Sequence, residues 1–522
     1  MEKEIYKNDS CTCRIQLISR RIQTKLKKLG FLVCLFLILG TGGFAATITS
    51  NAVTGNWSAP GTWAGGIVPG AGDDVIIANG ADITVDGNYT CQSLTYNGGN
   101  QDSWVNISAP NSLTVTGVTS ITSNSNNDYK AVIVNSGSFN TGTVDMNSNG
   151  NNRDAYIEIG TGTVTVTGDI TMNATDGRRN YILFSGNGTL NAGGTITGGI
   201  ITSTGGGSTT NPPTTGVVNY NNAGNQDIGD YTYYNLTISG SGNKSLTGAL
   251  TVSNDLTMSG GDMLLNGFNA SPVNVILTSG NIELGNNTLT MTGTLTGGSA
   301  SSMVVTNGTG YMIRNASATL PILFPVGTDG LYDPFSITAI NNTTGTISLR
   351  TTAFSALGPK YVARYWDVLT SVAGNTITAT FQYDASEITI APTVVYYKPG
   401  AGAWQTPSGS PGFGANTFSI TGTTDITTVN SSWTAGAVGT YYSYQTGNWD
   451  NPTTWTSDPG GTTQVGSTVP GDNDAVVILN GRTVSLPADI TAASLNVTIN
   501  SGGIIDMATY QFVAGLASST SS

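Results

Sequence analysis

This chain of 522 residues contains no histidine, and that absence narrows the chemistry that its other side chains can perform. Without an imidazole, Ser-His-Asp catalysis, Cys-His catalysis and histidine metal sites are excluded. The chain also lacks the side chain that serves most often as a general base. Carboxylate, lysine and arginine chemistry remains, the kind that β-helical polysaccharide lyases and inverting glycosidases use. One charge cluster could supply it, by holding calcium or by binding a uronate. Its members are Arg153, Asp154, Asp169, Asp176, Arg178 and Arg179. The simpler interpretation is a surface loop solvated by its own charges.

Two acidic motifs, Asp73-Asp74 and Asp472-x-Asp474, occupy equivalent places near the two ends of the chain. Each follows Val-Pro-Gly and precedes an apolar β-type segment. Carboxylate oxygens are ligands that calcium prefers, and 25 Asp against 3 Glu after residue 46 would favour a calcium-bridged turn. The alternative is that Asp73 and Asp474 accept backbone N–H bonds within the turn. We prefer the turn and expect no cofactor, with calcium as the one candidate.

Aromatic side chains, which can stack on sugar rings, gather in residues 301–436, which also hold five of the six basic residues after residue 300. The β-type segments are also longer there, which predicts one independent antiparallel β-sandwich of ordinary domain size. Arg364-Tyr365-Trp366-Asp367 is expected to be a core strand with one buried Trp. The candidates for an exposed, ligand-binding aromatic surface are Tyr396, Tyr397 and Trp404.

A tryptophan motif occurs twice, which indicates that the chain was built by duplication. Gly55-Asn-Trp-Ser-Ala-Pro-Gly-Thr-Trp63 is matched by Gly447-Asn-Trp-Asp-Asn-Pro-Thr-Thr-Trp455. Shared residues continue from Val68-Pro-Gly and Val469-Pro-Gly to Leu94 and Leu495, at a constant offset of 401. The tryptophans could form a sugar-stacking platform, but we expect them to cap the open apolar end of a first coil. The predicted capping residues are Trp57, Trp63, Trp449 and Trp455.

Between residues 83 and 298, short segments alternate apolar residues with Thr or Ser and are separated by Gly, Asn or Asp turns. Such spacing fits a sandwich, a barrel or a solenoid. We favour a solenoid because Leu236 and Leu256 are 20 residues apart and Leu277 follows 21 later, which suits one coil each. A chain of small sandwiches is the alternative.

The whole chain is therefore predicted to be all-β. Charged residues make up 10% of it, where about a quarter is usual, and no amphipathic helical pattern follows residue 46. The predicted order begins with a signal peptide at 1–46 and a right-handed parallel β-helix (solenoid), which includes the opening unit, at 47–300. An antiparallel β-sandwich follows at 301–436. Residues 437–522 are predicted to be a second, short or truncated copy of the opening unit and thus the start of another β-helix-like unit.

Residues 1–46 resemble an export signal, since basic residues precede an apolar run too short for a membrane span. Cleavage is expected near Ala45 or Ala46, and an uncleaved anchor is the alternative. Removal leaves Cys91 as the one cysteine of four, so no intrachain disulfide is expected. It also removes eight of 19 basic and three of 31 acidic residues, which gives a net charge of −17. Such a chain is a poor partner for nucleic acid or anionic membrane.

The opening unit, Trp57 to Leu94 and again Trp449 to Leu495, resembles the eight-glycine domain of secreted and cell-surface proteins. The residues that match its pattern are Trp57, Ser58, Thr62, Trp63, Gly66, Val68, Pro69, Gly72, Asp73, Val75, Ile77 and Gly80. The second copy departs from the pattern by a nine-residue insertion after Trp455, and by an Asn in place of Gly72. The layout also resembles large secreted β-helix repeat proteins of Gram-negative bacteria, adhesin-like cargo of the type nine secretion system, although no sorting domain is recognisable after Asp506.

This resemblance implies extracellular adhesion or polysaccharide binding. We expect a secreted or outer-cell-surface structural or adhesive protein without catalysis, with an extracellular glycan or cell-surface component as its partner and no membrane span in the mature chain. The alternative is a β-helical carbohydrate-active enzyme, a polysaccharide lyase or glycosidase, that uses Asp and Arg. Asp and Arg side chains that face each other in a groove would favour the enzyme. Flat surfaces of Thr and Asn side chains would favour the adhesin. Ice binding is less favoured because the coil lengths are irregular.

Overall fold

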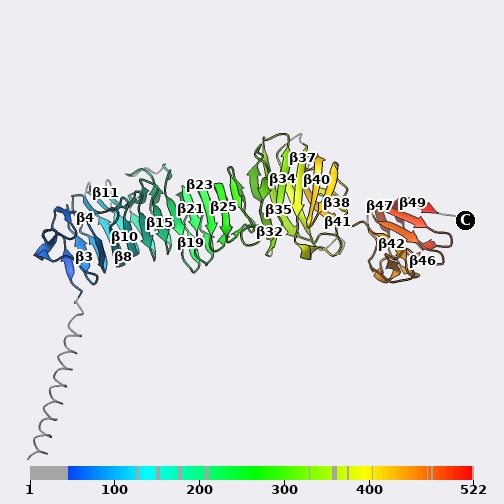
Figure 1. Ribbon diagram of the computed structural model, residues 1–522, viewed down its shortest axis with the longest axis horizontal. Helices are drawn as coiled ribbons and strands as arrows, with labels where there is room; N and C mark the ends of the chain where they lie inside the picture. Colours follow the sequence, from blue (N-terminus) through cyan, green and yellow to red (C-terminus); the bar gives the residue numbers. More distant parts are fainter. Residues whose placement is uncertain are drawn as a thin grey trace, which may run out of the picture. The chain divides into compact units, whose positions relative to one another are not determined.

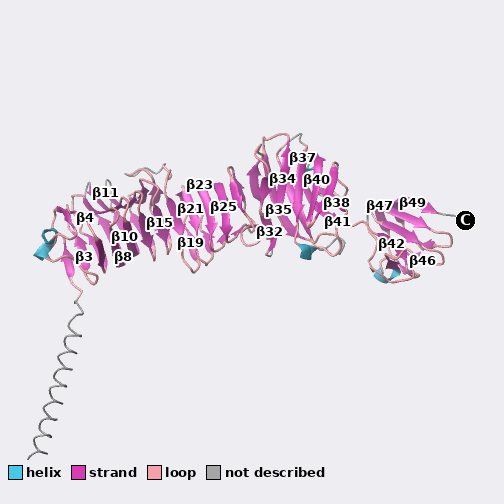
Figure 2. Ribbon diagram, in the orientation of Figure 1, coloured by secondary structure: helices cyan, strands magenta, loops and turns pink. Residues whose placement is uncertain are grey.

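The computed structural model describes residues 45–124, 128–148, 153–174, 179–205, 211–328, 330–354, 361–372, 376–402, 404–428, 430–466, 468–471 and 474–519. These residues form β-strands and turns, with a few helices of three or four residues (Figure 2). None of the helices in these ranges could cross a membrane. The predicted export signal lies outside them, except for its last two residues. The chain forms two compact units, residues 1–216 and 217–522.

The first unit is a parallel β-helix, which confirms the predicted fold class (Figure 1). Successive coils add strands to two sheets, with parallel pairing between the described strands. One sheet contains β1 (Thr47–Thr49), β3 (Asp74–Ile77), β5 (Asn88–Cys91), β6 (Ser93–Tyr96), β8 (Ser112–Ser123), β10 (Ser138–Ser148), β12 (Thr163–Val166), β13 (Ile170–Ala174), β15 (Thr189–Ala192) and β16 (Ile196–Gly198). The other contains β2 (Thr54–Asn56), β4 (Asp82–Val85), β7 (Ser103–Ile107), β9 (Asp128–Val134), β11 (Arg153–Ile159), β14 (Asn180–Phe184) and β17 (Ile200–Thr202).

The core of this unit is made of stacked apolar columns. Phe139 pairs with Leu113 in one neighbouring coil and with Val164 in the other, and Val164 pairs in turn with Leu190. All four side chains are at most 1% exposed. Because side chains alternate between the two faces of a strand, a register slip of one residue would turn this column to solvent. The apolar and Thr alternation therefore fixes both the fold and the register.

Glycine is required where the chain turns a corner between coils. A Cβ atom on Gly162 would lie 2.5 Å from the carbonyl oxygen of Gly137, one coil earlier. A Cβ on Gly188 would lie 2.6 Å from the carbonyl oxygen of Gly162. Both distances are far below van der Waals contact, so a column of glycines lets successive corners approach closely.

The second unit begins with further parallel coils, which are shorter. Leu236 pairs with Leu256, 20 residues later, as the spacing predicts. Leu256 pairs with Val275, 19 residues later, and Leu277 pairs with Met258. Leu277, which follows Leu256 by 21 residues in the sequence, is thus not its partner. A bulge in β23 changes the offset between paired residues from 20 to 19. One sheet contains β18 (Val217–Tyr220), β20 (Thr232–Tyr233), β21 (Asn235–Ile238), β23 (Leu250–Ser259), β25 (Ala270–Ser279), β27 (Leu289–Met291) and β28 (Leu295–Gly297). The other contains β19 (Gln226–Ile228), β22 (Lys244–Leu246), β24 (Met263–Leu264), β26 (Ile282–Glu283), β29 (Val304–Val305), β32 (Val326–Thr328) and β33 (Leu331–Tyr332).

Parallel and antiparallel pairing meet in β30 (Met312–Asn315), which pairs in parallel with β27 and antiparallel with β35. Two antiparallel sheets follow, and their aromatic rings make contact: Phe381 lies 5.5 Å from Trp366 and 5.8 Å from Trp433. Trp366 is fully buried, as expected. The sheet of β30 also holds β35 (Thr346–Ala353), β36 (Arg364–Thr370), β41 (Ser431–Gly436) and β38 (Val394–Pro399). The other consists of β31 (Ile322–Phe324), β34 (Phe335–Ile340), β37 (Ile377–Gln382), β40 (Thr417–Thr423) and β39 (Ser410–Gly414).

The last part of the second unit repeats the opening coils, again with parallel pairing between successive coils. One sheet contains β42 (Thr440–Ser443), β44 (Trp455–Thr456), β45 (Ala475–Ile478), β47 (Ile490–Ile499) and β49 (Phe512–Ser519). The other contains β43 (Gly447–Asn448), β46 (Thr483–Ser485) and β48 (Ile504–Asp506). The duplication in the sequence is therefore a duplication of structure.

Candidate functional site

The first tryptophan pair is buried within the opening coil. A short helix, η1 (Pro60–Thr62), separates the two residues and brings their rings to 4.9 Å at 69°. The indole N–H of Trp63 donates to the carbonyl oxygen of Trp57 at 2.7 Å. Trp57 also stacks on Tyr89 of the following coil at 5.7 Å. Since Trp57 and Trp63 are at most 1% exposed, neither ring offers a face to a sugar.

The second pair repeats this geometry around η4 (Pro452–Thr454). The rings of Trp449 and Trp455 are 4.9 Å apart at 71°, and the indole N–H of Trp455 donates to the carbonyl oxygen of Trp449 at 2.8 Å. Phe512 takes the place of the stacked tyrosine, at 5.2 Å from Trp449. Both tryptophans are again buried. All four residues therefore serve packing within the opening unit.

The acidic motifs hold turns together. Asp73 accepts hydrogen bonds from the backbone N–H groups of Gly70 at 2.8 Å and Ala46 at 3.0 Å. Asp474 accepts equivalent bonds from Gly471 at 2.7 Å and Gly439 at 2.9 Å. These contacts are those of the preferred turn interpretation.

The remaining acidic candidates do not join them in a cluster. The carboxylate of Asp74 accepts from the Ser93 hydroxyl at 2.5 Å, and Asp472 lies outside the described residues. In the part of the chain that the structure describes, no three acidic or cysteine residues are grouped so that they could hold a metal ion.

The aromatic candidates are divided between the interior and the surface of the antiparallel region. Tyr396 is 2% exposed and packs on Tyr361 at 5.4 Å, so it does not belong to an exposed surface as the sequence suggested. Its neighbour Tyr397 faces the other way and stacks half-buried on Trp433 at 5.3 Å. Trp404 is half-buried, 6.5 Å from the Tyr365 ring. Successive side chains along β38 point to opposite faces, so Tyr396 and Tyr397 contact different neighbours.

Little of the predicted charge cluster is available to a ligand. Asp154 is fully buried, and its carboxylate binds Arg179 at 3.0 Å and the Tyr181 hydroxyl at 3.0 Å. Asp169 accepts the backbone N–H of Thr195 at 2.8 Å. Asp176, Arg178 and the side chain of Arg153 lie outside what the structure describes. The described members thus stabilise neighbouring coils.

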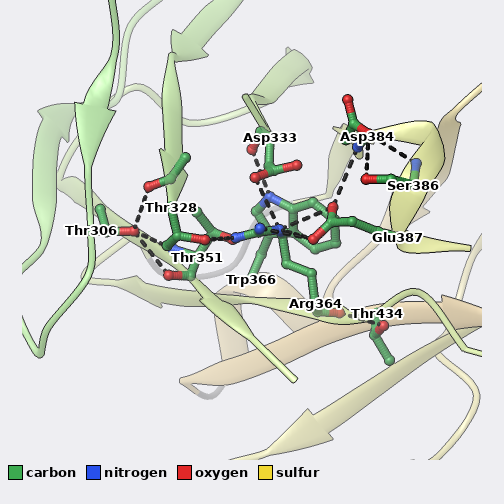
Figure 3. A network of polar contacts seen from close by, with 11 residues as sticks. Thr306, Thr328, Asp333, Thr351, Arg364, Trp366, Asp384, Ser386, Glu387 and Thr434 are labelled. Atoms are coloured by element: carbon green, nitrogen blue, oxygen red, sulfur yellow. Dashed lines mark hydrogen bonds and ion pairs between the residues drawn. The ribbon is translucent and has the colours of Figure 1, made fainter. Parts of the chain in front are cut away.

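A buried ionic network, which the sequence did not reveal, lies in the antiparallel region (Figure 3). The guanidinium of Arg364 binds Glu387 through Nε at 2.9 Å and Nη2 at 2.8 Å. Its Nη1 donates to the hydroxyls of Thr328 and Thr351 at 2.5 and 2.8 Å. Asp333 Oδ2 lies 3.0 Å from Arg364 Nε, although that N–H points at Glu387. One guanidinium therefore faces two carboxylates inside the fold.

This excess of negative charge has a consequence for protonation. Burial raises the pKa of Asp333, the charge of Arg364 offsets part of that effect, and the neighbouring carboxylate of Glu387 raises the pKa further. Asp333 consequently keeps its proton to a much higher pH than an ordinary aspartate. Both Asp333 and Arg364 are fully buried, so the network joins segments of the chain and does not meet a substrate.

Polar columns on the outside of the coils form the candidate binding surface. In the second unit, the side-chain amide of Asn254 donates to Asn235 at 2.8 Å, and Asn274 donates to Asn254 at 3.5 Å and to Asp255 at 2.9 Å (β21, β23 and β25 in Figure 1). The hydroxyl of Thr294 continues the column, donating to Asn274 at 3.0 Å. Spacings of 19 or 20 residues between these four positions are the sequence signal that would have found them.

Comparable contacts occur in the first unit. Asn106 donates to Asp82 at 2.6 Å, and Asn191 donates to Thr165 at 3.3 Å. These bonds hold the outer side chains in fixed orientations from one coil to the next. Such a face offers repeated hydrogen-bonding groups at the strand spacing of about 4.8 Å.

No family model, curated protein or solved structure matches this chain.

Proposed function

We propose that this protein is a secreted structural or adhesive protein of the cell surface, which binds glycan or another surface weakly at many points. The observation that supports it best is the column of outward amides and hydroxyls at Asn235, Asn254, Asn274 and Thr294. Each side chain contributes little, but many equivalent contacts along one surface add up to useful avidity.

The column is suited to this task because its side chains are already ordered. Asn254 uses one donor and one acceptor in the column, out of two donors and two acceptor lone pairs on an amide. A sugar hydroxyl, which both donates and accepts, can pair with either kind of group. Side chains fixed in advance lose less conformational entropy on binding.

A polysaccharide panel tests this proposal. The full chain is passed over immobilised neutral and acidic polysaccharides, with and without calcium, and the eluates are assayed for new reducing ends and unsaturated products. We expect retention on at least one polysaccharide without product release. Product release would replace the adhesive function with the enzymatic alternative, and failure to bind any polysaccharide or bacterial cell surface would also contradict the proposal.

A matched pair of variants connects the result to the column. Replacing Asn254 and Asn274 with Ala removes amides from the proposed surface, whereas replacing Tyr397 with Ala removes an aromatic ring from the antiparallel region. We expect the first change to weaken retention several-fold and the second to weaken it less. The opposite order would move the binding surface to the aromatic region.

A further inference from the structure

A pocket of about 440 Å³ lies in the second unit, beside the last parallel coil and the first antiparallel strands. The loop around Gly293, between β27 and β28, forms one side, and β30 with the start of β31 forms the other. This volume lies within the range of small-ligand pockets, about 300–1,000 Å³. Its polar lining includes Thr292, Thr294, Arg314, Asn315, Ser317 and Thr319.

Arg314 is the unusual member of this lining. It pairs with Met291 on the neighbouring strand. Two residues earlier on the same face of the sheet, Met312 pairs with Leu289. Those three apolar residues are at most 1% exposed, so the register places an arginine at the end of a buried apolar column. Charged side chains are costly in such positions unless they are paired.

Among the residues that the structure describes around Arg314, none supplies a counter-charge. Nη1 donates to the carbonyl oxygen of Leu323 at 2.5 Å, and the guanidinium carbon lies 5.9 Å from the centre of the Phe324 ring. Among the described residues, no carboxylate lies within ion-pair distance of Arg314. Burial lowers the pKa of Arg314, in accordance with a guanidinium that has lost water and gained no anion.

Arg350, on the adjacent strand β35, shows the ordinary solution. Its Nε and Nη2 both lie 2.7 Å from Asp367 Oδ2. Burial lowers the pKa of Arg350, but the hydrogen bond and charge of Asp367 outweigh burial and leave the pKa raised. Arg350 therefore has an anionic partner, and Arg314 has none among the described residues.

We propose that this pocket binds the carboxylate of an acidic sugar, a uronate, with Arg314 as its ionic partner. The planar guanidinium matches a carboxylate through two parallel hydrogen bonds. The hydroxyls of Thr292, Thr294 and Ser317 line the same pocket and can meet sugar hydroxyls.

The position of Thr294 connects the pocket to the polar column. Thr294 both lines the pocket and bonds to Asn274, so a glycan lying along the column would place one sugar at Arg314. This inference rests on the proposed function, since it names the sugar class that one site on the binding surface would take.

Calorimetry on the full chain tests the inference. The probes are trisaccharides of galacturonate, glucuronate and mannuronate, each compared with its methyl ester. The chain as a whole carries a net charge of −12, so general electrostatics disfavours the acids, and any preference for them must arise locally. We expect at least one acid to bind about tenfold more tightly than its ester.

Three variants locate that preference. Arg314→Gln should abolish it while leaving the affinity for the ester unchanged, and Arg314→Lys should lose most of it because an ammonium lacks the planar fork. Arg482→Gln removes the same charge from a turn outside the pocket and should behave as wild type. The Tm of Arg314→Gln should be equal to or above that of wild type, because the variant removes an unpaired, partly buried charge.

Equal binding of acid and ester for all three sugars would overturn the inference, as would a preference that survives in Arg314→Gln. Polysaccharide retention separates this failure from failure of the proposed function. If the wild type is retained on polysaccharide but shows no acid preference, the pocket assignment alone is wrong. If nothing retains the wild type, the proposed function is wrong as well.

Discussion

The two copies of the opening unit contain the same hydrogen-bonded turn in different surroundings. Asp73 and Asp474 each accept two backbone N–H bonds, with lengths between 2.7 and 3.0 Å. Asp474 is fully buried, whereas Asp73 is partly exposed. The paired indoles have the same spacing in both copies, 4.9 Å. The motif therefore specifies its own local geometry, while its energetic weight depends on what covers it.

The copies differ where the sequence match weakens. Val75 pairs with Leu94, but its equivalent Val476 pairs with Val497, two residues beyond the Leu495 that matches Leu94 in sequence. The constant offset of 401 therefore does not hold in structure as far as Leu495. The pairing of β45 with β47 is continuous, so the two-residue difference holds along the whole of this strand pair.

Truncating one tryptophan in each copy should have the largest effect and should show whether the copies are independent. We expect Trp63→Ala and Trp455→Ala each to cost about 3–5 kcal/mol of stability, because each removes a buried indole and leaves a cavity. In a chain that begins at Phe44, Cys91 is the single thiol and lies in the first copy. Burial, with the charges of Asp74 and Asp73, raises the pKa of Cys91 to about 12, so labelling at pH 8 should be slow.

We expect Trp63→Ala to accelerate labelling of Cys91 and Trp455→Ala to leave it unchanged. Urea unfolding followed by fluorescence supplies the stabilities. Equal acceleration in both variants would show that the copies unfold together. Trp63→Phe is the control, since it keeps most of the ring and should cost much less.

The antiparallel region should differ from both copies in its response to pH. The unfolded chain releases the Asp333 proton near pH 4, whereas the folded chain holds it until about pH 8. Between these values the folded state binds more protons, so the unfolding free energy falls as pH rises, by about 1 kcal/mol per pH unit. The contribution is fully present below pH 4. Asp333→Asn should flatten this slope in urea titrations at pH 5, 6 and 7, and an unchanged slope would assign it elsewhere.

Removing the turn carboxylate should reduce stability more in the second copy, where the carboxylate is buried, than in the first. Asp474→Ala should cost about 2–3 kcal/mol because it leaves backbone donors without partners in a buried place, and Asp73→Ala about 1 kcal/mol because water can replace the carboxylate. Thermal unfolding measures both. Calcium calorimetry on Asp73→Asn and Asp474→Asn should match wild type, and a clear loss of calcium binding would restore the metal interpretation.

The smallest effect concerns the insertion, which exists in the second copy alone. Asp458 accepts backbone N–H bonds from Thr462 and Thr463 at 2.9 Å and from Gly460 at 3.2 Å. These bonds lower the pKa of Asp458 to about 2. Order in this loop should be complete above pH 4 and be lost as pH falls through about 2. Asp458→Asn should speed proteolysis between residues 456 and 466 at pH 7, whereas Asp450→Asn, in an exposed turn, should not.

The β-helix could be predicted from sequence because its signal is local. The alternation of Leu or Val with Thr, with Gly and Asn at the turns, requires the same geometry in every coil. Its register was less predictable, since the bulge in β23 changes the offset between paired residues from 20 to 19, and Leu256 pairs with Val275 although Leu277 is the next leucine in the sequence. Bulges leave no spacing signal that one sequence can reveal.

The site residues were harder because they depend on contacts between distant segments. Tyr396 is buried and packs on Tyr361, whereas Tyr397 is half-buried. The sequence alone gives no signal that distinguishes these two adjacent tyrosines. The partners of Arg364 come from separate segments around residues 333 and 387, so no motif joins them. The sequence does not distinguish Arg314 from the other arginines. Its pairing with Met291, which places it at the end of a buried apolar column, depends on the strand register.

The corner glycines determine how such a chain can change in length during evolution. A Cβ atom on Gly162 would meet the carbonyl oxygen of Gly137, and one on Gly188 would meet that of Gly162, so each corner is fitted to the one before it. A genetic insertion or deletion that spans one whole coil restores the same contact, whereas a partial one brings a side chain against a carbonyl oxygen. The reach of this protein should therefore evolve in steps of one coil, by unequal recombination between neighbouring repeats.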